Sequence, residues 1–144
     1  MIEEVLSTFD FEDFRRIIII ALEEHCKDFD VEIILNQALG DLVEIFVLDK
    51  STNSSPETVY TCIKGLDLDG PIVIKDSDCL VEYSIPKEEN YVVSIDIHDQ
   101  HIPNLTAKSF LLSDENNLIK QIIEKRVVSD QVCLGVYSGN SEDF

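Results

Sequence analysis

The chain has 144 residues and a formal net charge of −18, and 44% of its residues are apolar. That length suits one domain with a sizeable core, and the apolar fraction argues against disorder. The acidic excess argues against nucleic acid or an anionic membrane as partner, because both bind through clustered Lys and Arg. We therefore expect a single domain over residues 1–144. Any phosphate ligand would need a metal ion, a helix N-terminus or a few focused cations to be held there.

Helices and strands alternate in the first half of the sequence. The apolar spacing predicts helices over residues 1–6, 28–39 and 56–66, and strands over residues 16–22, 42–48 and 71–75. The four isoleucines at 17–20 predict a strand that is fully buried in a parallel sheet. Pro56 behind a Ser cap is a helix start signal, and Ser54 with Glu57 fits a capping box. This alternation implies parallel strands with right-handed crossovers.

The second half is predicted to consist of strands, over residues 91–97, 107–112, 118–125 and 132–137. The middle two flank a polar turn at 113–117 and form a predicted β-hairpin. The expected fold is therefore a doubly wound α/β domain with a mostly parallel, mixed sheet.

The sequence shows no sign of export or of a membrane anchor. The most apolar run, residues 17–22, is too short to span a bilayer, and the N-terminus lacks the features of a signal peptide. The four cysteines are far apart and form no C-x-x-C pair, which argues against a zinc site or a disulfide framework. We expect a cytoplasmic protein with reduced thiols.

Two carboxylates follow the predicted strand at 71–75, in the order Asp76-Ser77-Asp78. Ligands of open α/β sheets bind beyond the carboxyl ends of the strands, and two such carboxylates are suited to share one Mg²⁺. The alternative is a polar turn, since Asp and Ser are common turn formers. His98 and His101 raise the same question, but Pro103 and the lack of a third ligand favour a surface loop.

Several segments resemble, in order, the sugar-phosphate nucleotidyltransferase family, in particular its capsular polysaccharide and phosphocholine branch. They are similar to that family's PTxGQAETVY, KDCDN, AKSF, IEKxxIS, CxGxYxF and SAEDF runs. The segments are STNSSPETVY at 51–60, KDSDC at 75–79, AKSF at 107–110, IEKRVVS at 123–129, VCLGVY at 132–137 and SEDF at 141–144.

The resemblance implies an enzyme that joins a nucleoside triphosphate to a sugar 1-phosphate or choline phosphate and releases pyrophosphate, with Mg²⁺ as cofactor. The acceptor oxygen would attack the α-phosphorus directly, so the protein would hold two anions in line and neutralise their charge. By position in the motifs, Asp78 is the first candidate Mg²⁺ ligand and a catalytic residue, and Asp76 is the second ligand.

Other site residues are implied by the same resemblance. Lys125 would meet the acceptor phosphate, with Glu124 fixing its direction, although an exposed lysine at a strand end is the alternative. Glu57 and Thr58 would lie near the nucleotide, although Glu57 also fits a purely capping role. Gly135 would allow the substrate to approach its strand closely.

The chain also departs from the family. The resemblance places the family's Gly-rich nucleotide loop and first strand before residue 1, and residues 1–144 contain neither. That strand would lie between the strands at 17–22 and 72–75. Without it, these two strands would have unpaired edges, unless they pair with each other or with another chain, such as a second copy. We therefore expect a truncated enzyme that is inactive alone, or a catalytically inactive relative with a binding or regulatory role.

Overall fold

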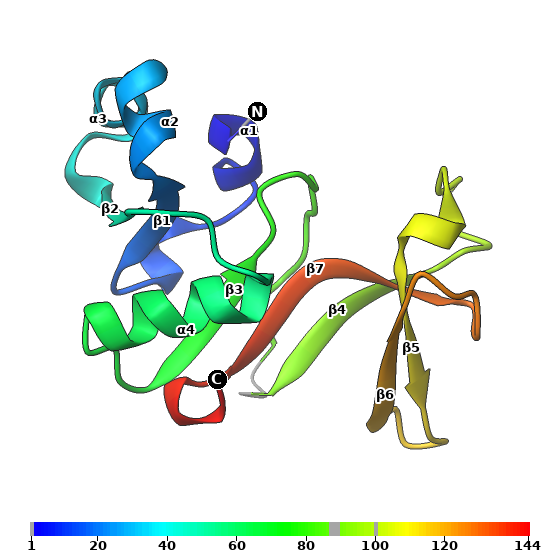
Figure 1. The fold of residues 1–144 in the computed structure, drawn as a ribbon. Coiled ribbons are helices and arrows are strands. Elements are labelled where there is room, and N and C mark those ends of the chain that lie inside the picture. Colours follow the sequence, from blue (N-terminus) through cyan, green and yellow to red (C-terminus); the bar gives the residue numbers. More distant parts are fainter. Residues whose placement is uncertain (1, 87–89, 100) are drawn as a thin grey trace.

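The computed structural model describes residues 2–86, 90–99 and 101–144, in an α/β arrangement (Figure 1). No helix in these ranges has both the length and the apolar character needed to cross a bilayer. The helices are α1 (Ile2–Leu6), α2 (Glu23–Asp28), α3 (Val31–Leu39) and α4 (Ser55–Gly65), with single 3-10 turns at Phe11–Asp13, Gly40–Leu42, Leu105–Ala107 and Ser141–Asp143. The strands are β1 (Ile17–Leu22), β2 (Val43–Leu48), β3 (Pro71–Lys75), β4 (Tyr91–Asp96), β5 (Ser109–Ser113), β6 (Ile119–Glu124) and β7 (Gln131–Asn140).

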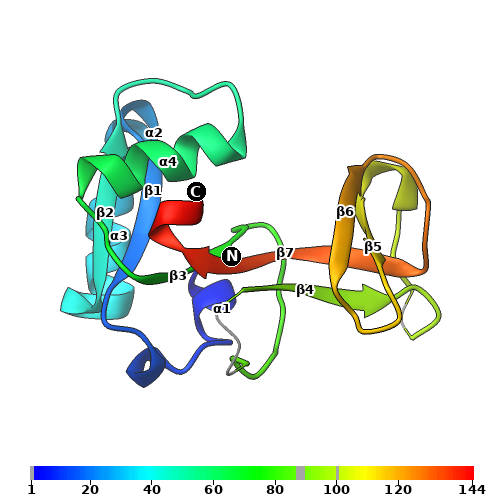
Figure 2. The ribbon, with the colours of Figure 1, turned by 90° about the horizontal axis from the view of Figure 1, so that it is seen from below.

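The N-terminal half is a parallel pair of strands between two layers of helices. β1 and β2 pair in parallel, and α2 and α3 form the crossover between them. In Figures 1 and 2, α2 and α3 lie on one side of this pair and α4 lies on the other. Leu35 of α3, Leu48 of β2 and Ile63 of α4 are buried. These layers confirm the expected α/β crossovers for this half of the chain.

The strand β1 is less buried than its four isoleucines predict. Every residue of β1 is half-buried, and none is fully buried. Within the ranges that the structure describes, β1 pairs with β2 alone, and β3 belongs to a different sheet. Each of these strands therefore has one edge without a partner there, as the resemblance implied. The prediction of a fully buried β1 is wrong, because covering both faces requires neighbours on both edges as well.

The second sheet is antiparallel throughout. Its order is β3-β7-β5-β6, with β4 also pairing with β7. Of the mostly parallel sheet that was expected, only the β1–β2 pair is confirmed. The physical reason lies in the connections. In the described residues after β3 the helices are single 3-10 turns, so no helical crossover is available there to join parallel strands. The predicted hairpin is confirmed, with the Asp114 carboxylate accepting hydrogen bonds from the backbone N–H groups of Asn116 and Leu118.

The long strand β7 is central to this sheet and bulges in its middle. Val92 of β4 pairs with Tyr137, but Ser94 pairs with Cys133, so residues 134–136 of β7 lie opposite Val93 alone. Gly135, in the centre of this bulge, has φ +68°. A bulge of this kind bends its strand, and β7 curves visibly in Figure 1. Along β7, residues 136–140 pair with β3, and Val132, before the bulge, pairs with Phe110 of β5.

The contact between α4 and β2 provides a test of this packing. A Cβ atom added to Gly65 would lie 2.7 Å from two ring atoms of Phe46. Gly65→Ala should lower the free energy of unfolding by about 1–3 kcal/mol, because the ring must move. The same change in a Phe46→Leu background should cost less, as measured by urea denaturation. Equal costs in both backgrounds would contradict this packing.

Candidate functional site

The turn after β3 is held in place by Lys75. Its ammonium group donates hydrogen bonds to the backbone carbonyl of Asp76, at 2.6 Å, and to that of Cys79. The backbone N–H of Asp76 donates to the carbonyl of Gly135 at 2.8 Å, which continues the β3–β7 ladder by one residue. The turn that carries Asp76 and Asp78 is therefore anchored at both ends. The only indication of this role in the sequence is that Lys75 directly precedes Asp76-Ser77-Asp78.

The carboxyl group of Asp76 lies against the backbone of β7. A Cβ atom built on Gly135 would be 2.9 Å from both Cβ and Cγ of Asp76, and still closer to its Oδ2. Burial of the carboxyl group raises its pKa, the charge of Asp78 raises it further, and Lys75 lowers it. No hydrogen bond or ion pair of the Asp76 carboxylate is found in the described ranges. Asp76 and Asp78 therefore form a pair of carboxylates that repel each other.

Two carboxylates are a donor set that Mg²⁺ can use, because Mg²⁺ binds oxygen ligands and is commonly held by one or two carboxylates, with water and substrate phosphates completing its shell. Across residues 2–86, 90–99 and 101–144, no group of three or more His, Cys, Asp or Glu side chains comes together around one point. A cation at Asp76 and Asp78 would therefore need water or substrate oxygens as further ligands. His98 and His101 are exposed, as expected of a surface loop.

Glu57 and Thr58 form part of the cap of α4. The Ser54 hydroxyl accepts a hydrogen bond from the backbone N–H of Glu57 at 3.3 Å. The Glu57 carboxylate accepts from the backbone and side-chain N–H groups of Asn53, at 2.7 and 2.9 Å. The Thr58 hydroxyl is hydrogen-bonded to that of Thr52. Both predicted nucleotide-binding residues therefore have local capping partners. In Figures 1 and 2, α4 begins on the side of the molecule where β3 ends.

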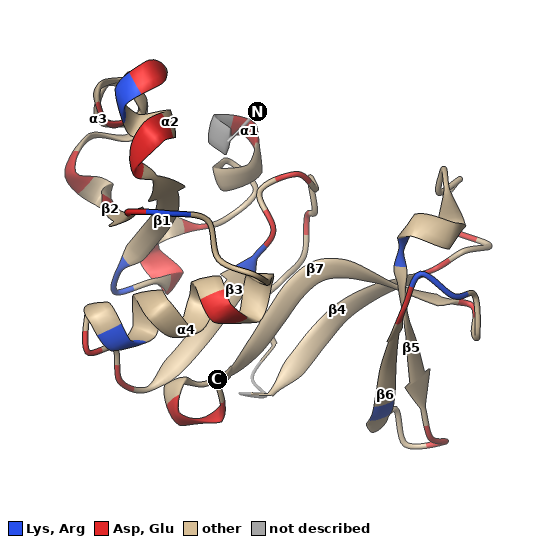
Figure 3. Cartoon of the chain, in the orientation of Figure 1, with Lys and Arg blue, Asp and Glu red and all other residues tan. Residues whose placement is uncertain are grey.

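Lys125 lies at the end of β6, and its side chain is 68% exposed. Its ammonium group is 3.0 Å from a carboxylate oxygen of Glu124, which is the expected ion pair. Its backbone has φ +57°, and its N–H donates to the carbonyl of Lys108 at 2.9 Å. Figure 3 shows this basic segment at the β5–β6 arm, away from the end of β3. No interaction found in the described ranges joins Lys125 to Asp76 or Asp78.

Tyr137 is a neighbour of Asp76 that the sequence reasoning missed. The Cys133 thiol donates a hydrogen bond to the Tyr137 hydroxyl at 3.2 Å, across the bulge. Burial raises the pKa of Tyr137, as do Cys133 and the carboxylates of Asp76 and Glu124. This phenol therefore stays neutral and lies within electrostatic reach of the ends of both β3 and β6. The alternation of Cys133, Gly135 and Tyr137 is that of any regular strand, so the sequence carries no signal for the bulge that lets Cys133 and Tyr137 meet.

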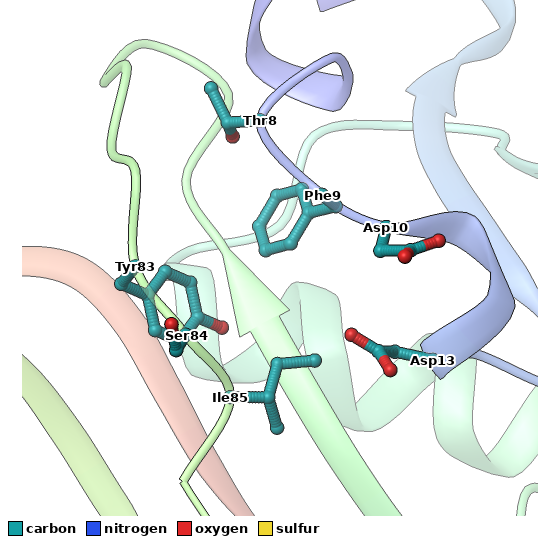
Figure 4. A pocket seen from close by; sticks show the side chains of 7 residues that line it. All are labelled: Thr8, Phe9, Asp10, Asp13, Tyr83, Ser84 and Ile85. Carbon is teal, nitrogen blue, oxygen red and sulfur yellow. The ribbon is translucent and has the colours of Figure 1, made fainter.

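A cavity of about 490 Å³ lies elsewhere in the fold (Figure 4). It is formed by the segment after α1 and the segment that follows the turn at Asp76, and the rings of Phe9 and Tyr83 meet edge-on beside it. None of the residues predicted for the site lines this cavity. Its lining residues are Thr8, Phe9, Asp10, Asp13, Tyr83, Ser84 and Ile85.

Comparison by sequence finds no match among protein families or curated proteins. Solved structures do match. The nucleoside-diphosphate-sugar pyrophosphorylase of Vibrio cholerae is 18% identical with a TM-score of 0.77, covering 99% of this chain and 62% of that protein. A Bacillus anthracis protein described as a putative glucose-1-phosphate thymidylyltransferase, in complex with a sucrose, is 19% identical with a TM-score of 0.69. The match covers 98% of this chain and 57% of that protein. HddC of Yersinia pseudotuberculosis is 14% identical with a TM-score of 0.68, and the match covers 99% of this chain and 64% of that protein.

These neighbours are nucleotidyltransferases, and the likeness extends over nearly all of the present chain. The chain itself spans less than two thirds of the length of each neighbour. At these identities the likeness concerns the fold. The described residues therefore share the α/β fold of these solved structures.

The cap of α4 gives a pH-dependent prediction. The hydrogen bonds from Asn53 favour the charged carboxylate and lower the pKa of Glu57. A lowered pKa stabilises the folded state at pH values above the ordinary pKa of Glu, and this contribution is lost as the pH falls through the folded-state pKa. Asn53→Ala removes the side-chain hydrogen bond and keeps the backbone one, which is the larger cause, so it should raise the pKa of Glu57 part of the way towards its ordinary value in an NMR titration. Ser51→Ala, in the same exposed loop, is the control and should leave it unchanged. An unchanged pKa in Asn53→Ala would contradict the assignment.

Proposed function

We propose that this chain forms part of a nucleotidyltransferase that uses Mg²⁺ to transfer a nucleotidyl group from a nucleoside triphosphate to a sugar 1-phosphate or phosphocholine. The observation that supports the proposal is the carboxylate pair at the end of β3, within a fold that aligns over 99% of the chain with a nucleoside-diphosphate-sugar pyrophosphorylase. HddC, of the same fold, has been solved in complex with GMP-PN. The resemblance of the AKSF and EKRVVS segments supports the capsule and phosphocholine branch, with the reaction taking place in the cytoplasm.

The charges of the chain explain why a metal is needed. With a net charge of −18, the protein repels a triphosphate unless a cation lies between them. Bound Mg²⁺ would supply that positive charge and polarise the phosphate oxygens. Asp76 and Asp78 would hold it, and Lys75 keeps their turn in one conformation. The acceptor phosphate oxygen would then attack the α-phosphorus, and pyrophosphate would leave.

The other proposed residues bind and orient the two substrates. Glu57 and Thr58 begin α4, whose first backbone N–H groups are suited to base or ribose oxygens. Lys125 would bind the acceptor phosphate, and its ion pair with Glu124 directs the ammonium group. This role requires the β5–β6 arm to approach the end of β3 when the acceptor is bound. Gly135 lies beside Asp76 and therefore at the same end of β3.

A second proposal is a catalytically inactive relative that binds metal and nucleotide for a regulatory purpose. The exposed position of Lys125, away from Asp76, favours it. The unpaired edges of β1 and β3 would then suit a second copy or a partner chain. Both proposals require the same metal site, and neither expects turnover by residues 1–144 alone.

The metal site predicts the effect of removing each carboxylate. Wild-type protein should bind one Mn²⁺, used as a probe for Mg²⁺, more tightly than its general acidic surface does. Asp76→Asn and Asp78→Asn should each weaken that binding in calorimetry, because one of two charged ligands is lost. The control is Asp10→Asn/Asp13→Asn, which neutralises two carboxylates that line the cavity of Figure 4 and should leave the tight Mn²⁺ site intact. Tight binding that survives in Asp76→Asn/Asp78→Asn would remove the metal assignment.

A turnover assay tests whether residues 1–144 are sufficient for catalysis. We expect the 144-residue chain alone to release no pyrophosphate above background from nucleoside triphosphates, Mg²⁺ and sugar 1-phosphates or phosphocholine. The reason is that residues 1–144 contain no Gly-rich phosphate-binding loop. Steady release that Asp78→Ala abolishes would show instead that this chain is a complete catalyst.

A further inference from the structure

The bulge of β7 provides a seat for the carboxyl group of Asp76. The backbone hydrogen bond from Asp76 to Gly135 brings the last ladder position of β3 against the centre of the bulge. At that point the space that a side chain of Gly135 would occupy contains Cβ, Cγ and Oδ2 of Asp76. A Cβ atom at 2.9 Å from two carbons is closer than real Cβ contacts allow, so the aspartate side chain or the strand would have to move.

Backbone conformation alone does not account for this contact. Gly135 has φ +68°, which already favours glycine. Gly40 also has a positive φ, +60°, but a Cβ atom there would meet nothing within 4 Å. Both glycines therefore have a φ that disfavours a side chain, and they differ in what lies beside them. Only the close approach at Gly135 involves a residue of the candidate metal site.

We propose that Gly135 is a positioning residue for Asp76: its missing side chain lets the carboxyl group rest on β7, which fixes that group relative to Asp78. The inference rests on the proposed function, because the positioned carboxylate is a proposed ligand of Mg²⁺. Mg²⁺ demands near-octahedral geometry with short bonds, so a displaced carboxylate loses affinity. Lys75 holds the turn from one side and β7 supports it from the other.

The test measures Mn²⁺ affinity by electron paramagnetic resonance, in which free and protein-bound Mn²⁺ give different signals. Gly135→Ala should weaken binding roughly 10–100-fold, as is usual when a group supporting a metal ligand is changed. Gly40→Ala is the control. It also places a side chain at a positive φ, but at a site where the new Cβ atom meets nothing within 4 Å, so its affinity for Mn²⁺ should stay within about twofold of wild type.

The outcomes separate this inference from the proposed function. If Asp76→Asn does not weaken Mn²⁺ binding, Asp76 is not a ligand, and both the metal assignment and the role of Gly135 fail. If Asp76→Asn weakens binding but Gly135→Ala behaves like Gly40→Ala, only the positioning role is overturned.

A second measurement covers the case in which Gly135→Ala is too unstable for metal titration. Asp76→Gly removes all three atoms that a new Cβ would meet. Asp76→Gly/Gly135→Ala should therefore unfold at a higher urea concentration than Gly135→Ala. If the Asp76→Gly change fails to recover stability, the contact does not determine the need for glycine, and the proposal is overturned.

Discussion

The contact between Asp76 and the bulge of β7 is the constraint on which the candidate site depends. It joins the two halves of the fold, since β3 follows the helical half and β7 is central to the antiparallel half. Val132, just before the bulge, and Val136, within it, are both buried and keep β7 in place. Because the strand cannot shift easily, the carboxyl group that rests on it is fixed as well.

Electrostatics explain why this contact has a functional meaning. A carboxylate with a raised pKa beside a second carboxylate is a costly arrangement, and Lys75 offsets only part of the repulsion. The two residues are exposed, so the cost comes from the repulsion between the two neighbouring charges, and a divalent cation would relieve it for Asp76 and Asp78 together. The same cation would allow an acidic protein to accept an anionic nucleotide.

Local signals in the sequence were enough to predict most of the elements. The Ser-Pro start of α4, the apolar run of β3 and the polar turn between β5 and β6 each depend on nearby residues, and all are confirmed. The single helix expected over residues 28–39 is instead α3 with a separate α2 before it. The mostly parallel sheet was wrong for the second half because strand direction depends on how chain segments connect, which local patterns do not contain.

The site was predictable to a similar degree. Asp76 and Asp78 were found from their place at a strand end, and Gly135 from its motif, but the contact between Asp76 and Gly135 depends on β3 pairing with β7. Tyr137 and Lys75 were missed because their roles arise from a bulge and a turn. Lys125 was chosen from its motif alone, and its distance from β3 depends on the orientation of the β5–β6 arm.

The most direct test of the central claim is the binding position of one Mn²⁺ ion, read from paramagnetic broadening of backbone amide signals by NMR. A metal held by Asp76 and Asp78 should broaden first the amides of residues 75–79 of the turn and residues 134–136 of the β7 bulge. These two segments are far apart in sequence and are brought together by the pairing of β3 with β7. Broadening that begins instead around Asp10 and Asp13, or that is uniform over the acidic surface, would contradict the account.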